Sequence, residues 1–131
     1  MKGLDTNALV RLLVADHPAQ TERIASLLQA AEVAGERFFV SSLVLLELVW
    51  VLDSAYGCAR TEILDALERL AAMPVLHLDH LDAVHRAITY ARKSKQEIDD
   101  LLIGCCAAAA GCTAVMTFDR SASRHELFEL L

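Results

Sequence analysis

Two spacings of apolar residues run through the chain and predict helices that alternate with short strands. Helical spacing, with apolar residues three and four apart, begins near residues 6, 18, 42, 61, 80 and 99. Short segments between these stretches predict strands at 2–4, 38–40, 75–77, 115–117 and 128–131, and the aromatic and β-branched run at 38–40 is one of them. Strands that alternate with helices pair in parallel, with helices on both faces of the sheet. We therefore expect an α/β fold, in which ligands bind beyond the carboxyl ends of the strands.

Helix-starting residues stand at the expected boundaries. Ser41 or Ser42, Thr61 and Asp79 are each placed to cap the helix that follows. No linker, repeat or low-complexity tract interrupts the pattern, so we expect residues 1–131 to form a single domain. Hydrophobic residues make up 55% of the chain, which is above the typical ~45–50%. The excess suggests further apolar burial against a partner, and a homodimer is the simplest hypothesis.

The charge balance limits the kinds of partner. A formal net charge of −6 excludes affinity that rests on a broad basic surface. Small basic groups remain and are candidate RNA contacts: Arg92, Lys93, Lys95, Arg120 and Arg124. No apolar run reaches the roughly 18 residues of a membrane span, and an acid as early as Asp5 does not fit a signal peptide. We expect a cytoplasmic protein without a membrane partner.

Several acids stand where a parallel sheet places its ligand site. Asp5 and Asp119 each follow a predicted strand, and Asp99 and Asp100 open a helix without other charges. Ordinary alternatives exist, because Asp5 suits a helix cap, Asp119 suits a turn, and one acid of the pair suffices as a cap.

Glu47 is the acid with the weakest ordinary explanation. Its helical neighbours three and four positions away are all apolar: Leu43, Val44, Trp50 and Val51. A carboxylate buried among them would cost several kcal/mol unless it is paired or protonated. The alternative is a carboxylate that reaches solvent at the edge of the domain or pairs with an arginine.

Together, Asp5, Glu47, the pair Asp99 and Asp100, and Asp119 predict a cation site. Carboxylates gathered in one place repel one another unless a cation neutralises them. Oxygen ligands alone suit Mg²⁺ or Mn²⁺ better than zinc. The histidines and cysteines lack zinc-site spacing, and the chain has no glycine-rich phosphate loop.

Four segments, in this order, carry a family resemblance: Asp5-Thr6-Asn7, Ser42 with Leu45-Leu46-Glu47, Asp100-Leu101-Leu102-Ile103-Gly104, and Thr117-Phe118-Asp119-Arg120. The chain resembles the PIN-domain ribonucleases over its whole length, and most closely the VapC-like toxins of bacterial toxin–antitoxin pairs. The resemblance implies a three-layer α/β/α sandwich around a parallel sheet of about five strands. It also implies a Mg²⁺ or Mn²⁺ site, endonucleolytic cleavage of RNA, and a small antitoxin as partner.

The resemblance also assigns roles to residues. By position, Asp5, Glu47 and Asp100 match the family's three core acids, and Asp119 matches its fourth, more variable acid. These four would be both the catalytic residues and the metal ligands.

Supporting roles follow in the same way. Thr6, Asn7 and Thr117 match polar neighbours that would orient the carboxylates or the attacking water. One departure concerns Asp99, because the family usually has an aromatic or small residue directly before its third acid. The Asp-x-x-Ile-Gly run favours Asp100 as the ligand and leaves Asp99 in support.

Water activated by a metal ion can hydrolyse an RNA phosphodiester without a covalent nucleophile. We expect products with a 5′-phosphate and a 3′-hydroxyl. Two alternatives remain. A Mg²⁺-dependent phosphatase of the haloacid-dehalogenase type would need Asp-x-Asp after the first strand, where Asn7 fills the second position. The other is a PIN-like domain that binds RNA or protein without cutting.

Overall fold

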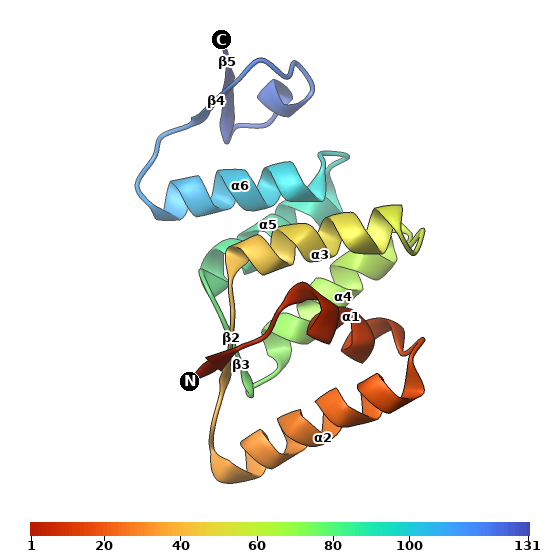
Figure 1. Ribbon diagram of the computed structural model, residues 1–131. Coiled ribbons are helices and arrows are strands. Elements are labelled where there is room, and N and C mark those ends of the chain that lie inside the picture. The colour runs from red at the N-terminus through yellow and green to blue at the C-terminus, as the bar shows by residue number, and fades with distance from the viewer. The chain divides into compact units, whose positions relative to one another are not determined.

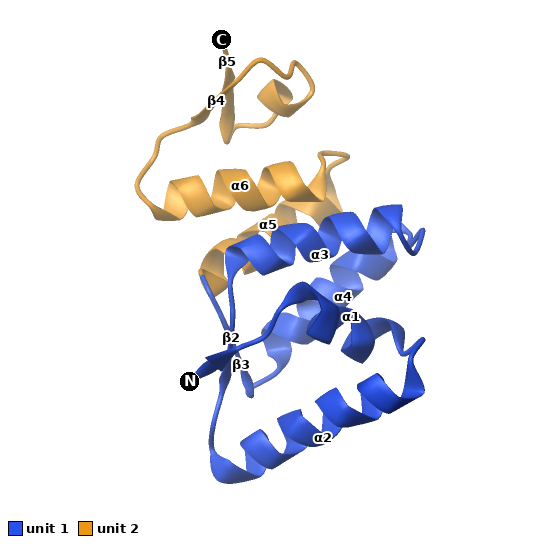
Figure 2. Ribbon diagram, viewed as in Figure 1, with its two compact units in different colours: residues 1–79 blue, residues 80–131 orange.

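The computed structural model describes all residues from 1 to 131. The chain divides into two compact units, residues 1–79 and residues 80–131 (Figures 1 and 2).

Unit 1 combines three parallel strands with four helices (Figure 1). In chain order these are β1 (Lys2–Gly3), α1 (Thr6–Val14), α2 (Pro18–Ala34), β2 (Phe38–Val40), α3 (Ser42–Ser54), α4 (Arg60–Ala72) and β3 (Leu76–Leu78). The strands pair in the order β1-β2-β3, with Phe38 opposite Lys2 on one side and Leu76 on the other. Because all three strands run in one direction, the residues that follow them share one edge of the sheet.

Local capping explains where these helices begin. The Ser41 hydroxyl accepts a hydrogen bond from the Val44 amide at 3.2 Å, so Ser41 caps α3 as the sequence predicted. The expected cap at Thr61 is wrong. Helix α4 begins at Arg60, one residue before Thr61, and its N-cap is Ala59. The Ala59 amide donates to the Glu62 carboxylate at 2.8 Å.

The expected cap at Asp79 is also wrong. His80 is the N-cap of the following helix and adopts a left-handed conformation with φ of 54°. Asp79 remains in the strand ladder, where its amide donates to the carbonyl of Val40 at 2.9 Å. Its carboxylate instead accepts from the Ser42 hydroxyl at 3.4 Å, across the edge of the sheet.

Leucines from three helices fill the core of unit 1. Helix α1 packs against α2 and α3, α3 packs against α4, and α4 packs against β3. The largest fully buried side chains of this unit are Leu9, Leu45, Leu48, Leu64, Leu67 and Leu70. Each contributes about 1.5–3 kcal/mol through removal of its apolar surface from water.

Unit 2 consists of two packed helices followed by two short strands (Figure 2). Its elements are α5 (Leu81–Lys93), α6 (Ile98–Ala109), β4 (Val115–Thr117), the 3₁₀ helix η1 (Ala122–Arg124) and β5 (Phe128–Leu130). Helix α5 packs along α6, and β4 pairs in parallel with β5. A Cβ atom at Gly104 would lie 3.0 Å from side-chain atoms of both Leu127 and Phe128, so glycine favours this close approach to α6.

The α/β class and the parallel pairing expected from the sequence are confirmed. The five strands are hydrogen-bonded as a sheet of three in unit 1 and a sheet of two in unit 2. None of the helices has both the length and the hydropathy to span a membrane.

Candidate functional site

Asp5 stands at the carboxyl end of β1 and starts helix α1. Its Oδ1 accepts a hydrogen bond from the Ala8 amide at 2.9 Å, which makes it the N-cap. The capping role considered from the sequence is therefore present. The side chain is exposed and its Oδ2 makes no hydrogen bond within the protein, so this oxygen is available to a ligand.

The two residues after Asp5 differ in their surroundings. Thr6 is only 5% exposed, and its hydroxyl is the one buried side-chain oxygen without a hydrogen-bond partner. Leaving such a group unpaired costs about 1–3 kcal/mol, so a ligand or water that satisfies it would be favoured. Asn7 is exposed beside it.

The structure corrects the environment expected for Glu47. Its side chain is exposed, because α3 buries the opposite face through Leu45, Leu48 and Val49. The exposed face also carries Leu43, which is 77% exposed. Burial therefore does not force a cation or an arginine onto Glu47, and the carboxylate instead stands among exposed apolar side chains.

In unit 2, Asp100 lies in the first turn of α6, near other acids. Partial burial raises the pKa of the Asp100 carboxyl, and the negative charges of Asp99, Asp119 and Glu97 raise this pKa further. The Oδ1 of Asp99 also accepts a hydrogen bond from the Asp100 amide at 2.9 Å. Neither aspartate caps the helix, since Glu97 is the N-cap residue.

Asp119 forms the turn after β4. Its Oδ1 accepts hydrogen bonds from the amides of Ser121 at 2.8 Å and Ala122 at 3.3 Å, which hold the start of η1. Its own amide donates to the Thr117 hydroxyl at 2.9 Å. Thr117 thus orients the backbone of Asp119, and the negative charge of Asp119 contributes to the raised pKa of Asp100.

The candidate RNA contacts are all exposed residues of unit 2. Arg92 and Lys93 end helix α5, and Lys95 follows it. Arg120 precedes η1, and Arg124 is the last residue of η1.

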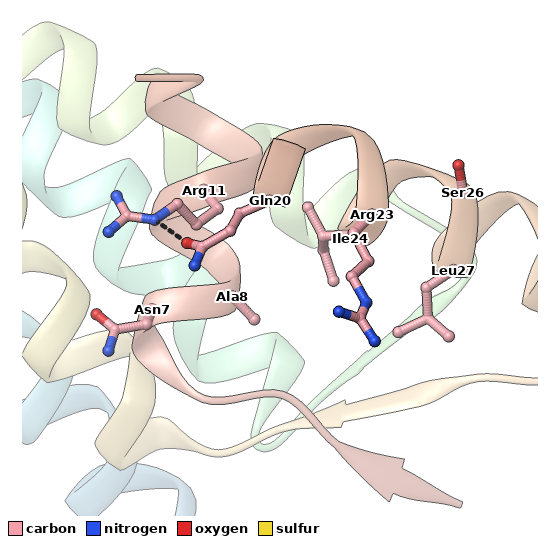
Figure 3. Close-up of a pocket in the computed structure, with 8 residues that line it drawn as sticks. All are labelled: Asn7, Ala8, Arg11, Gln20, Arg23, Ile24, Ser26 and Leu27. Atoms are coloured by element: carbon pink, nitrogen blue, oxygen red, sulfur yellow. Dashed lines mark hydrogen bonds between the residues drawn. The ribbon is translucent and has the colours of Figure 1, made fainter. Parts of the chain in front are cut away.

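A groove that the sequence did not predict lies between α1 and α2 (Figure 3). It is lined by Asn7, Ala8, Arg11, Gln20, Arg23, Ile24, Ser26 and Leu27. It has a volume of about 710 Å³. Asn7 is the only predicted site residue that lines it. Arginines on the polar side of a helix are common, so periodicity gave no signal for this feature.

The predicted acids fit the chemistry of a hard divalent cation. Asp5 and Glu47 belong to unit 1, and Asp100 and Asp119 belong to unit 2. Neither unit alone gathers three or more acidic, histidine or cysteine side chains that could hold a metal ion. The negative charges that raise the pKa of Asp100 would be balanced by an oxygen-liganded cation.

Comparison of the sequence with known proteins identifies its family. The chain is 27% identical to a VapC ribonuclease of Aquifex aeolicus (strain VF5). The aligned 120 residues cover 92% of this chain and 88% of that protein. No solved structure matches the chain. The family model of the PIN domain matches residues 3–126, across both units, and the chain therefore belongs to the PIN domain family.

Proposed function

We propose that this protein is a Mg²⁺- or Mn²⁺-dependent endoribonuclease. The observation that supports the proposal is the Asp100 carboxyl, whose pKa is raised by partial burial and then by the negative charges of Asp99, Asp119 and Glu97. Such a concentration of negative charge is unfavourable without a cation. The likeness to a VapC ribonuclease supports RNA as the substrate, and membership of the PIN family favours a nuclease over a dehalogenase-like phosphatase.

Asp5, Glu47, Asp100 and Asp119 would hold the metal. Bound by them, the ion supplies activation of water and neutralisation of charge on the phosphoryl oxygens. Asp5 keeps one oxygen in the helix cap and offers the other, while Asp119 does the same from its turn. Glu47 is free to approach because it is exposed.

The supporting residues would fix these acids in place. Thr117 holds the turn of Asp119, and Asp99 holds the amide of Asp100. The exposed Asn7 amide would bind water or a phosphoryl oxygen beside Asp5, and the buried Thr6 hydroxyl would bind an enclosed water. Arg92, Lys93, Lys95, Arg120 and Arg124 would contact the RNA backbone. One family model spans both units, which supports their action as one domain.

The decisive experiment incubates purified protein with single-stranded RNA and Mn²⁺, or with EDTA. We expect cleavage only with Mn²⁺, and losses of more than about 100-fold in Asp5→Asn and Glu47→Gln. Glu32→Gln, an exposed acid on α2, is the matched control and should cleave normally. Products with a 2′,3′-cyclic phosphate, or equal cleavage by all variants, would contradict the proposal. RNA binding without cleavage would identify a non-cutting PIN domain.

A toxin role in a cytoplasmic toxin–antitoxin pair is the proposed biological setting. The resemblance to VapC-like toxins supports a small antitoxin, whose arginine would suit the carboxylates. Exposed apolar side chains such as Trp50 and Phe118, which are 64% and 82% exposed, support a homodimer. Light scattering should give twice the 14.3 kDa chain mass, and a monomer at every concentration would exclude the dimer.

A further inference from the structure

The groove between α1 and α2 has a charge opposite to that of the whole chain. Its lining includes two arginines, Arg11 and Arg23, and no acid, although the chain carries a net charge of −6 (Figure 3). Its other polar groups are the neutral side chains of Asn7, Gln20 and Ser26. This groove is therefore complementary to an anion.

The two arginines differ in their hydrogen-bond partners. Arg11 is fixed: its guanidinium donates to Gln20 at 2.6 Å, to Asp16 at 3.0 Å and to Tyr56 at 3.3 Å. The hydrogen bond with Tyr56 and the charge of Asp16 raise the pKa of Arg11, so its charge is retained and largely balanced.

Arg23 has no such partner. It is exposed, forms no ion pair, and its side chain extends from α2 toward the space beside Ala8 (Figure 3). Its guanidinium can therefore bind a phosphate without first breaking an internal contact.

The position and the lining of the groove indicate which anion it binds. Asn7 lines the groove and stands two residues after Asp5, so the groove adjoins the start of α1. Ile24 and Leu27 provide an apolar wall, with Leu27 46% exposed. A nucleotide offers a phosphate for the guanidinium and a sugar and base for such a wall.

We propose that this groove binds a nucleotide of the RNA strand next to the cleaved bond, with its phosphate on Arg23. The proposal rests on the ribonuclease function proposed above. RNA fits better than an acidic peptide because the groove adjoins Asp5, where a strand under cleavage must pass. The Asn7 amide and the NH2 group of Gln20, whose oxygen already accepts from Arg11, also match the hydrogen-bonding groups of ribose and bases.

The first test measures binding of a fluorescent single-stranded RNA by anisotropy in EDTA, which prevents cleavage. Compared with wild type, Arg23→Gln should raise Kd about 10-fold, and Arg23→Lys should restore part of the affinity. The slope of log K against log salt should fall by about 0.7 in Arg23→Gln, as expected for one lost phosphate contact. Arg69→Gln, an exposed arginine on α4 outside the groove, is the matched control.

The second test measures cleavage in Mn²⁺. Arg23→Gln should raise KM and leave kcat nearly unchanged, because its phosphate contact exists before and during the reaction. In one outcome, wild type binds RNA without cleaving it, while Arg23→Gln weakens that binding. This result would support the groove as an RNA site and reject the nuclease function. Cleavage with the same Kd, salt slope and KM in the Arg23 and Arg69 variants would overturn the groove. The proposal would also be overturned if Arg23→Gln weakened binding of an acidic amphipathic peptide and left RNA binding unchanged.

Discussion

Asp5 has a structural task and a proposed catalytic task, and its two oxygens divide them. Oδ1 caps α1 through the Ala8 amide, while Oδ2 is available to a metal ion. Asparagine and aspartate cap helices about equally well, whereas alanine does not cap. The two tasks can therefore be separated by the choice of substitution.

We predict that Asp5→Asn keeps stability within about 0.5 kcal/mol of wild type and loses cleavage by more than about 100-fold. Asp5→Ala should lose the same activity and also about 1 kcal/mol of unfolding free energy. Urea denaturation and RNA cleavage measure the two effects. An Asn variant that remains active would show that Asp5 is only a cap.

Asp100 predicts a pH dependence of stability. Its folded pKa is raised, by burial first and then by Asp99, Asp119 and Glu97. The folded state therefore binds the proton more tightly than the unfolded state. This contribution to stability is complete below the unfolded pKa and is lost as the pH rises through the folded pKa.

We predict that Asp100→Asn in EDTA is more stable than wild type at pH 7 and equal to it near pH 3. Asp99→Asn should show part of this gain, because it removes one of the charges that act on Asp100. Thermal denaturation between about pH 3 and pH 8 measures both curves. A less stable Asn variant at pH 7 would mean that the helix dipole outweighs the neighbouring acids.

At the residue scale, the sequence anticipated the ordinary roles of Asp5 and Asp119, because capping and turn bonds depend on neighbours within three positions. It misjudged Glu47. The apolar neighbours of Glu47 along α3 suggested burial, but exposure depends on which face of the helix the rest of the protein covers. That face is not encoded in a helix that is apolar on nearly all sides.

At the scale of elements, Gly104 sets the approach of α6 to the segment that carries β5. A Cβ atom there would meet Leu127 Cβ, Leu127 Cδ1 and Phe128 Cε2, each at 3.0 Å. Leu127 and Phe128 are only 8% and 9% exposed, so they have little room to move. Close packing against Leu127 and Phe128 therefore explains the glycine of the Asp-x-x-Ile-Gly run.

We predict that Gly104→Ala destabilises the protein by about 1 kcal/mol. Overpacking costs about 1–3 kcal/mol, and the better helix propensity of alanine returns up to about 1 kcal/mol. Leu127→Ala creates space at the same point, so the double variant should be more stable than the sum of the single effects. Urea denaturation of the three variants measures this coupling, and simple additivity would show that the contact is relieved elsewhere.

At the scale of the whole molecule, the proposed metal site depends on both units. Two of its acids come from residues 1–79 and two from residues 80–131, and neither unit alone gathers three metal-ligating side chains. Metal binding should therefore respond equally to the loss of an acid from either unit.

We predict that Mn²⁺ at 100 times its Kd stabilises wild type by about 2.7 kcal/mol. Glu47→Gln and Asp100→Asn should each remove most of this gain, whereas Glu32→Gln should keep it. Titration calorimetry and thermal denaturation with and without Mn²⁺ provide the measurements. If one of the two acids proves irrelevant to Mn²⁺ affinity, the ion is held within a single unit and the four-acid site is wrong.

The sequence by itself determined the order and type of the elements, because helical and strand spacing are properties of neighbouring residues. It also determined that acids follow β1 and β4, and that the strands pair in parallel, since helices separate them. These conclusions need only local geometry and the connection rules of α/β folds.

Only the tertiary structure decided the exposure of Glu47, the contact of Asp79 with Ser42, and the division of the strands into sheets of three and two. It also decided that Arg23 stands unpaired in a groove while Arg11 is tied to Tyr56, 45 positions away. Each of these depends on contacts between distant segments. Such contacts are set by how whole helices pack, and no local spacing of residues encodes that packing.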